Sequence, residues 1–498
     1  MKKKLLAVLL SVAMMTTLLA GCGGGNDSAK ESSQTETKET QDSTGTGQES
    51  EPGQESESAK AEGEAQEQTS ADGSKVVKFA LADSSKGGLT WQQEIVDKFE
   101  EETGYTVEVT LIPTNQDMYS KIMMLMTSEE TCPDVIAEDG FMINSDAAAG
   151  RLMALDDALA DWEDLDKFDP AILEGGRGTD GKLYGVMCST DTQIVYYNKD
   201  LFKEIGIEGE WQPKNWDELM DVAKKLKEAN ADVEDFVPMW LWASQTFPEE
   251  TSMRTFQHFL SGTEGEWPEQ IYDTATGNWV VDREKLLTVL NFVNDAFNTY
   301  QVTQTPAQAS DLSMGDQLVS DYMQNNKIGI YITGSWTLGQ FQEGNAFPWA
   351  EAEEHWGQAT LPTNNGQAPG MTTVSGGWSW AIPAMAPNKE GAVAFLKALC
   401  SYEGISARVT YQGETSPRTD VAESDAYKNQ HPSSLVYSGS QLPYTHFRPS
   451  VDGYSSVTVA FTKMVEDVAF GAATPDEAVD GLQAEMIRLF GEEKVTVK

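Results

Sequence analysis

The chain has 498 residues, of which 79 are Asp or Glu and 35 are Lys or Arg, so its formal net charge is −44. Contact with nucleic-acid phosphates requires a basic surface, and this charge balance therefore excludes a nucleic-acid-binding protein. The four cysteines show no CxxC or Cys/His ligand spacing, so neither a zinc site nor a disulfide framework is indicated. The length is sufficient for two large lobes.

The N-terminus predicts export. Lys2 to Lys4 are basic, residues 5–19 are apolar, and the run ends at Ala20-Gly21-Cys22. This pattern is typical of a secretory signal, and the apolar run is shorter than the about 20 residues of a spanning helix. The segment 19–22 resembles the lipobox of bacterial lipoproteins, in which the Cys is acylated. We therefore expect residues 1–21 to be a signal peptide. Acyl chains such as palmitate on Cys22 then hold the chain on the extracellular face of the cell membrane.

Residues 22–74 form the next segment, which is rich in Gly, Ser, Thr, Gln and Glu. A segment with so few apolar residues does not bury enough surface to offset its ordering entropy, so a disordered acidic tether is predicted. With Cys22 acylated, the remaining Cys132, Cys188 and Cys400 cannot all pair. We expect them to be small buried apolar residues.

From Lys75 onward, short β-rich runs alternate with helical periodicity. Strands are predicted at residues 76–81, 107–111, 133–136, 182–186, 193–197, 328–332 and 378–382. Helices are predicted around residues 91–99, 122–126, 216–226, 286–297, 392–399 and 474–489, with Asn215 and Thr474 as N-caps and Gly104 just past the end of the first. This alternation is typical of βαβ units and mainly parallel sheets.

Several ordered segments resemble the family 1 extracellular solute-binding proteins, the maltose-binding type. They are FEEETG at 99–104, CPDVI at 132–136, AAGRLMALD at 148–156, DGKLYGV at 180–186, YYNKDLF at 196–202, NWDEL at 215–219, TGSW at 333–336 and PR at 417–418. Each segment is degenerate alone, but their order and spacing extend over nearly all of the chain after Lys75.

The resemblance implies an α/β, two-lobed periplasmic-binding-protein-like fold of type II. Each lobe is expected to be a mainly parallel sheet flanked by helices, and a multi-crossing hinge joins the two. By analogy, the crossings are placed near 186–189, 356–361 and 387–391. Lobe 1 is then 75–187 plus 358–390, and lobe 2 is 188–357 plus 391–498. The ligand is expected in the cleft, with hinge closure producing the form that a permease recognises.

The expected function is that of an ABC-transporter substrate-binding lipoprotein. It is expected to capture a carbohydrate, specifically an oligosaccharide, and to deliver it to the membrane permease. The 13 tryptophans support a sugar, since pyranose C–H faces stack on aromatic rings while hydroxyls bind planar polar groups. We expect a monomer without cofactor or metal.

Four tryptophans are candidates for stacking. Trp336 lies in the Gly-Ser-Trp element after the 328–332 strand and resembles a cleft aromatic of the family. Trp240 and Trp242 follow Pro238 at the end of a predicted strand, and their side chains are expected to point to the same side of that strand. Trp378 follows two glycines, where bare backbone permits close approach of a ligand. Core packing remains the alternative for each of them.

The polar candidates follow strands or crossings. Glu138 and Asp139 follow the 133–136 strand, at the strand end where ligands of α/β sheets bind. Asp191 follows the first predicted crossing and is a second acceptor. Arg418 either donates to ligand oxygens or pins the hinge by an ion pair, and Tyr444 is a further aromatic candidate.

Three other functions compete with sugar import. The same fold could bind a peptide, a polyol or another non-sugar solute, or it could act as a ligand sensor for a membrane kinase. A secreted carbohydrate-active enzyme is the third alternative. The four histidines are scattered, and the sequence contains no Gly-x-Ser-x-Gly, His-Glu-x-x-His or Walker motif, so we expect no enzymatic activity.

Overall fold

The computed structural model describes residues 75–83, 89–113, 118–265, 267, 269–343, 345–429, 433–449 and 451–498. The predicted signal peptide, the lipidated Cys22 and the tether lie outside the described residues. In these ranges no helix has both the length and the apolar character needed to cross a membrane.

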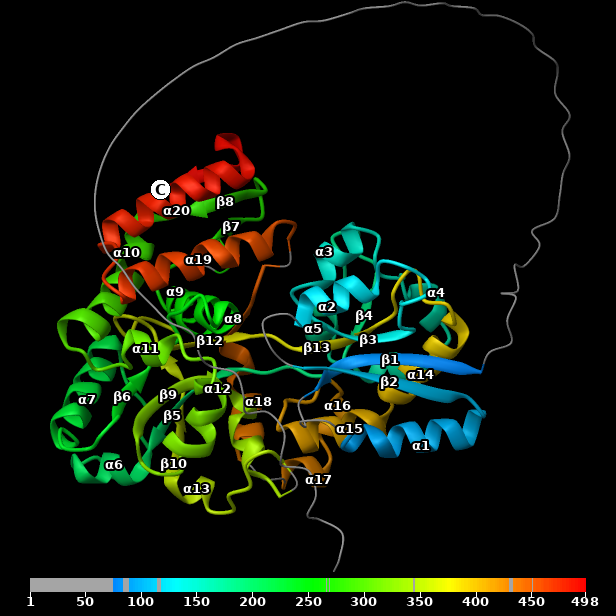
Figure 1. The fold of residues 1–498 in the computed structure, drawn as a ribbon, viewed down its shortest axis with the longest axis horizontal. Helices are drawn as coiled ribbons and strands as arrows, with labels where there is room; N and C mark the ends of the chain where they lie inside the picture. The colour runs from blue at the N-terminus through cyan, green and yellow to red at the C-terminus, as the bar shows by residue number, and fades with distance from the viewer. Residues whose placement is uncertain are drawn as a thin grey trace, which may run out of the picture. The chain divides into compact units, whose positions relative to one another are not determined.

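The first lobe is built on a five-stranded mixed sheet in the order β2-β1-β3-β13-β4 (Figure 1). Strand β1 is parallel to β2 and β3, whereas β13 is antiparallel to both β3 and β4. The strands are β1 (Val76–Asp83), β2 (Thr106–Pro113), β3 (Val135–Asp139), β4 (Gly185–Met187) and β13 (Trp378–Ala381).

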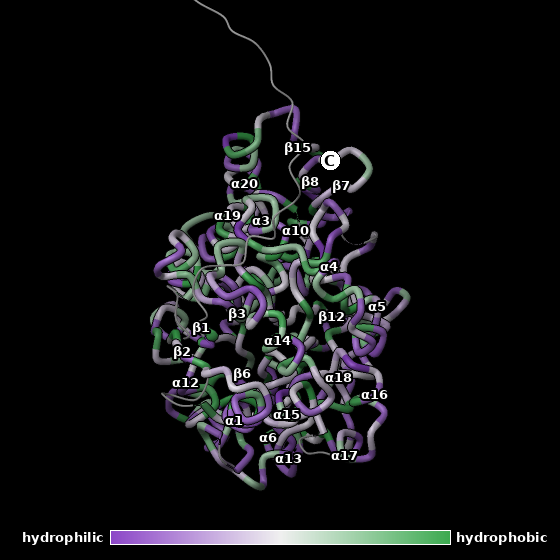
Figure 2. The backbone as a smooth tube through the Cα atoms, turned by 90° about the vertical axis from the view of Figure 1, so that its right-hand side faces the viewer, coloured by the Kyte–Doolittle hydropathy of each residue, from purple (hydrophilic) through white to green (hydrophobic). Residues whose placement is uncertain are grey.

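Helices of this lobe cover the sheet with apolar faces. They include α1 (Trp91–Thr103), α2 (Met118–Leu125), α14 (Lys389–Leu399) and α15 (Tyr402–Gln412). Along α1, Ile95 and Phe99 are buried at helical spacing, and Figure 2 shows hydrophilic residues on the same helix. As predicted, the helix ends at Gly104, which takes the left-handed conformation with φ 70°. Phe79, Phe99 and Phe395 then meet in one core.

The second lobe is built on a four-stranded sheet in the order β10-β5-β9-β6, accompanied by two three-stranded sheets. The strands of the main sheet are β5 (Gln193–Asn198), β6 (Val237–Trp240), β9 (Ile328–Gly334) and β10 (Trp356–Ala359). The two smaller sheets are β11 (Leu361–Pro362), β12 (Met371–Ser375) and β14 (Thr445–Phe447), and β7 (Tyr272–Asp273), β8 (Asn278–Val281) and β15 (Val495–Val497).

The helices of the second lobe include α7 (Trp216–Ala229), α10 (Arg283–Asn294), α19 (Tyr454–Ala469) and α20 (Pro475–Phe490). Helix α20 begins as predicted, because Thr474 and Glu477 form a capping box at its start. Asn215 caps α7, accepting a hydrogen bond from the Glu218 backbone N–H at 2.9 Å. Helices α10, α19 and α20 pack together in one hydrophobic cluster.

The chain passes between the lobes after β4, between β12 and β13, and again around α18 (Ser434–Gln441) (Figure 1). On this packing we assign residues 75–187 and 378–429 to lobe 1, and residues 192–375 and 442–498 to lobe 2. The predicted boundaries differ from this packing. Residues 358–375, expected in lobe 1, include the end of β10 and strand β12, which contacts β5 of the second lobe, and α14 and α15, expected in lobe 2, pack on α1. Periodicity identifies a helix but not the sheet against which it packs.

The three cysteines of the described ranges, Cys132, Cys188 and Cys400, are buried and free. Their burial confirms the expectation that they serve as small apolar residues.

Candidate ligand-binding site

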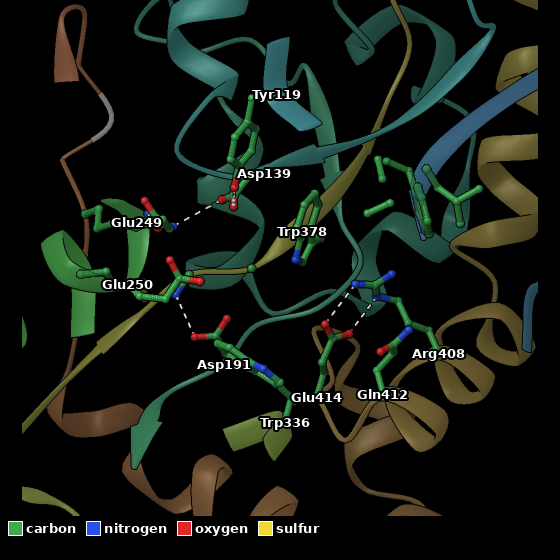
Figure 3. Close-up of a pocket in the computed structure, with 18 of the residues that line it drawn as sticks. Tyr119, Asp139, Asp191, Glu249, Glu250, Trp336, Trp378, Arg408, Gln412 and Glu414 are labelled. Atoms are coloured by element: carbon green, nitrogen blue, oxygen red, sulfur yellow. Dashed lines mark hydrogen bonds and ion pairs between the residues drawn. The ribbon is translucent and has the colours of Figure 1, made fainter. Parts of the chain in front are cut away.

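A cavity of about 350 Å³ lies between the two lobes (Figure 3). Lobe 1 contributes residues from β1, β3, β13 and α15. Lobe 2 contributes the π-helix η3 (Thr251–Gln257), the residues just before it and the 3-10 helix η6 (Ser335–Phe341). A site whose walls come from both lobes couples ligand binding to closure, because the ligand contacts both walls only in the closed form.

Trp336, a candidate for ligand stacking, lies at the start of η6 and forms part of the cavity wall. Its ring folds back over Gly334, the last residue of β9. A Cβ added at Gly334 would lie 1.9 Å from the Trp336 ring, so glycine is required there for this orientation. The ring is half-buried, and the guanidinium carbon of Arg254 lies 5.1 Å from its centroid. One indole face is therefore supported by a cation.

Trp378 is the second predicted aromatic that lines the cavity, and it lies at the first position of β13 beside the crossing. Its carbonyl accepts a hydrogen bond of 2.7 Å from the Cys188 backbone N–H. The preceding Gly377 has φ 147°, and a Cβ there would meet the Ser189 carbonyl oxygen at 2.3 Å. At Gly377, therefore, the missing side chain permits the close approach of a second backbone segment, whereas the sequence suggested the close approach of a ligand.

Two predicted carboxylates also line the cavity. Asp139 is the last residue of β3 and accepts hydrogen bonds from the Tyr119 hydroxyl at 3.0 Å and from Arg448 Nη2 at 3.3 Å. Asp191 lies on the crossing after β4 and is only 8% exposed. It accepts from the Gly376 N–H at 3.2 Å, and within the described part of the chain it has no ion-pair partner. Asp191 thus presents a buried acceptor to the cavity.

The cavity is more acidic than basic. Among its described lining residues are five carboxylates (Asp139, Asp191, Glu249, Glu250 and Glu414) and three guanidinium groups (Arg254, Arg408 and Arg448). In the view of Figure 3, the Tyr119–Asp139 pair and the Arg408–Glu414 pair lie on opposite sides of Trp378. Arg408 Nε lies 2.9 Å from Glu414 Oε2. An excess of carboxylates favours hydroxyl donors over anionic ligands.

Burial shifts the proton affinities of these groups. Loss of solvent raises the pKa of the Asp191 carboxyl to about 7, with the Gly376 N–H opposing the shift. Burial also raises the pKa of Glu249 to about 7 against the opposing charge of Arg448. The pKa of the Tyr119 phenol is raised well above its usual value, first by burial and then by Asp139 and Glu249. Tyr119 is therefore a neutral donor at physiological pH.

The predicted Trp240 and Trp242 do not line the cavity. Trp240 is the last residue of β6 and is fully buried, and Trp242 is 3% exposed. They do point the same way, with ring centroids 5.6 Å apart, but into the core of lobe 2. Arg254 lies between Trp242 and Trp336, at 5.4 Å and 5.1 Å from their rings. Trp242 is thus one layer behind the cavity wall.

Two polar candidates, Glu138 and Arg418, and the aromatic candidate Tyr444 are also not among the residues that line the cavity. Glu138 precedes Asp139 within β3, so the alternation of the strand turns it into the protein, where it is 3% exposed. Arg418 is 2% exposed and forms ion pairs with Asp164 at 2.8 Å and Asp420 at 2.7 Å. Tyr444 ends the short 3-10 helix η7 (Leu442–Tyr444).

Several charged residues that line the cavity were not predicted from the sequence, namely Arg448, Glu249, Glu250, Arg254, Arg408 and Glu414. Arg448 and Glu249 are 199 residues apart in the chain and lie in a loop and at the start of a short helical segment, where no periodic pattern marks a site. One signal was present. Arg448 stands between Phe447 and Pro449 in a chain in which basic residues are scarce.

No group of three or more His, Cys, Asp or Glu side chains in the described ranges is arranged to hold a metal ion. Four of the five lining acids, Asp139, Glu249, Glu250 and Glu414, instead contact arginines, whereas Asp191 accepts from a backbone N–H. The arrangement is that of a polar pocket with aromatic walls, which binds a ligand through stacking and hydrogen bonds.

These features are those of a solute-binding protein that closes around its ligand. The chain belongs to the bacterial extracellular solute-binding protein family, whose sequence profile matches residues 82–405. The resemblance drawn from the short segments is thereby confirmed, as is the α/β fold of type II. The expectation of a mainly parallel sheet in each lobe is wrong, because β13 is antiparallel to β3 and β4 in lobe 1 and β5 is antiparallel to β9 and β10 in lobe 2.

Relatives and solved structures agree with this assignment. A maltooligosaccharide ABC transporter solute-binding lipoprotein of Streptococcus pneumoniae is 22% identical over 432 residues, covering 86% of this chain and 93% of the relative. Maltose-bound MalE3 of T. maritima superposes with a TM-score of 0.70 at 22% identity, covering 83% of this chain and all of that one. The GacH receptor of Streptomyces glaucescens, described in complex with acarbose, has a TM-score of 0.70 at 19% identity, covering 84% and 98% of the two chains.

Proposed function

We propose that this protein is the substrate-binding lipoprotein of an ABC importer and that it captures a carbohydrate in the interlobe cavity. One observation carries the proposal. Trp336 and Trp378 line the same cavity as the carboxylates Asp139 and Asp191. Aromatic rings suit the C–H faces of a pyranose, and buried carboxylates accept hydrogen bonds from its hydroxyls.

The charge of the cavity narrows the ligand class. Five carboxylates against three guanidinium groups leave a net negative lining. This favours a neutral sugar over a phosphorylated or carboxylated one, because an anion would be repelled in a space with little solvent to screen it. The relatives whose names mention maltooligosaccharide and maltose support the same ligand class.

The cellular setting belongs to the proposal as well. An acylated Cys22 would tether the protein to the extracellular face of the cell membrane through residues 22–74, and the closed form would deliver its sugar to the permease subunits. We propose that the protein acts as a monomer without a cofactor and has no enzymatic activity. The lipoprotein description of the streptococcal relative supports the anchor.

The test is a thermal-unfolding screen of the purified full-length chain in detergent against neutral mono- and oligosaccharides, sugar phosphates, polyols and peptides. A ligand that binds only the folded form at about 1,000 times its Kd adds roughly 4 kcal/mol of stability, so the true cargo raises Tm visibly. A shift with neutral sugars alone supports the proposal. A response to peptides or polyols alone would leave the family intact and overturn the carbohydrate. Shortened oligosaccharide products after incubation would instead indicate an enzyme.

A further inference from the structure

The cavity wall contains an ion-pair bridge between the lobes, formed by Arg448, Asp139 and Glu249. Arg448, from the loop before α19 in lobe 2, contacts Asp139 of β3 in lobe 1 at 3.3 Å. Its other terminal nitrogen donates to Glu249 of lobe 2. The Arg448 side chain is only 5% exposed, so the bridge lies inside the protein.

Aromatic contacts extend the bridge into a wall. The guanidinium carbon of Arg448 lies 4.5 Å from the centroid of the Phe141 ring, in the segment after β3. Phe141 in turn meets Tyr119 at 5.5 Å and Tyr454 of α19 at 6.2 Å, both edge to face. The Tyr119 hydroxyl donates to Asp139. A continuous layer therefore runs from lobe 1 through Phe141 to lobe 2.

The Arg408–Glu414 side of the cavity differs in construction. Arg408 Nη2 lies 3.1 Å from Glu414 Oε1 and 3.3 Å from the Ser189 hydroxyl. Its guanidinium also lies over Trp380 at 5.4 Å. These partners come from lobe 1 and the crossing segments, so this ion pair does not span from one lobe sheet to the other.

We propose that the Asp139–Arg448–Glu249 bridge ends the cleft and restricts the ligand to one or two sugar rings, with Arg448 as the residue that sets ligand length. The proposal rests on the carbohydrate function argued above. The cavity volume of about 350 Å³ is consistent with it. That value lies near the lower limit of the roughly 300–1,000 Å³ typical of ligand pockets.

A longer ligand has to displace the Arg448 side chain. Displacement removes the cation from two carboxylates, Asp139 at 10% and Glu249 at 28% side-chain exposure, and opens the contact with Phe141. Leaving buried carboxylates without their cation is strongly unfavourable. We therefore expect the native protein to bind a tetrasaccharide about 100-fold or more weakly than the disaccharide of the same series.

The experiment is a chain-length series measured by titration calorimetry on the full-length protein in detergent. The probes are the mono- to tetrasaccharides of α-1,4-glucose, β-1,4-glucose and β-1,4-mannose. The variant Arg448→Met retains part of the aliphatic stem and removes the charge. The double variant Arg448→Met/Glu249→Gln also removes the carboxylate left behind, which covers the case in which the single variant does not fold.

Arg283→Met is the matched control. Arg283 also lies between two carboxylates, Asp480 at 2.6 Å and Asp476 at 2.7 Å, but these are on α20 and none of the three lines the cavity. Its length profile is expected to equal that of the native protein, whereas the Arg448 variants are expected to bind tri- and tetrasaccharides at least about tenfold more tightly than the native protein does.

The outcomes separate the two proposals. Binding confined to short sugars in the native protein and extended to longer ones in the Arg448 variants supports the bridge as the length determinant. Equal affinity of the native protein for di- and tetrasaccharides overturns the length proposal and leaves the carbohydrate function standing. An unchanged length profile in the folded variants overturns the role of Arg448. No binding of these series to the native protein, together with no response to any sugar in the thermal-unfolding screen, removes the carbohydrate function, and the length proposal with it.

Discussion

The same residue types occur in the lobe interiors and in the interlobe cavity, but their roles differ between the two regions. Arg418 and Arg448 are both buried between two carboxylates. The partners of Arg418, Asp164 and Asp420, belong to lobe 1, whereas Arg448 joins Asp139 of lobe 1 to Glu249 of lobe 2. An ion pair within one lobe contributes to the free energy of unfolding. An ion pair between lobes contributes to closure and ligand choice.

The tryptophans divide in the same way. Trp240 is fully buried in the core of lobe 2, whereas Trp336 is half-buried at the cavity wall. Both are large aromatic side chains that follow a strand or end one, so residue type alone does not separate them. The difference lies in their surroundings: Trp240 is enclosed by the core of one lobe, whereas Trp336 borders the cavity between the lobes.

The largest expected effect is that of Trp240→Ala. Removing a fully buried indole leaves a cavity in the core formed with Trp242 and Tyr331, so the free energy of unfolding should fall by about 3–5 kcal/mol. Urea unfolding followed by circular dichroism measures it. The affinity of the remaining folded protein for its sugar is expected to be unchanged. A large loss of affinity without loss of stability would place Trp240 in the site after all.

The next largest effect is the loss of stability that we expect for Arg418→Ala. The variant loses two ion pairs, the hydrogen bond to the Cys400 carbonyl and the packing on Phe168. Because Asp164 and Asp420 retain 40% and 33% side-chain exposure, we expect a loss near the lower limit for a broken buried pair, about 3 kcal/mol.

The stability of Arg418→Ala is also measured by unfolding in urea, with Arg283→Ala, a substitution at a partly exposed ion pair, as control. Sugar affinity is expected to be native in both variants. Weakened binding by Arg418→Ala at full stability would contradict the assignment of Arg418 to the lobe interior.

Trp336→Ala should leave stability nearly unchanged and weaken sugar binding by about 10- to 100-fold, through loss of the stacking surface. Titration calorimetry measures the affinity, and Trp336→Phe is expected to recover part of it. Native affinity in the alanine variant would mean that the ring at this position is structural.

Much of the fold was predictable because local rules decide it. Helix α1 ends at Gly104, α20 begins with the Thr474–Glu477 capping box, and β9 follows the Ile328–Ile332 alternation. The assignment of elements to lobes was not local. Helix α14 packs on β1, more than 300 residues earlier in the chain, and no pattern within α14 indicates that partner.

The site was predictable to the extent that it follows strand ends and glycines. Those rules identified Asp139, Asp191, Trp336 and Trp378. They also selected Glu138, although the period of two along β3 places adjacent residues on opposite faces. Arg448 and Glu249 escaped because tertiary contact alone brings the two together.

The smallest expected effect concerns pH and Asp191. Burial raises the pKa of the Asp191 carboxyl to about 7, whereas the pKa of an Asp in an unfolded chain is about 3.9. The folded protein then binds more protons than the unfolded chain between these values, so the stability of the ligand-free protein should fall as pH rises from about 4 to 7. Asp191→Asn is expected to reduce this slope without abolishing it, because Glu249 has its pKa raised to about 7 as well.

Ligand binding should shift the pKa of the Asp191 carboxyl in the direction opposite to the shift caused by burial. Sugar hydroxyls donate to the ionised Asp191 carboxylate, which lowers its pKa, so binding at pH 7 should release about half a proton. If only the ionised form binds, the affinity at pH 8 should exceed that at pH 6 by about tenfold. Calorimetry in buffers of different ionisation enthalpy measures the proton release, and Asp191→Asn should lose most of it. Proton release that persists in full in this variant would assign the titration to Glu249, and with it to the bridge between the lobes.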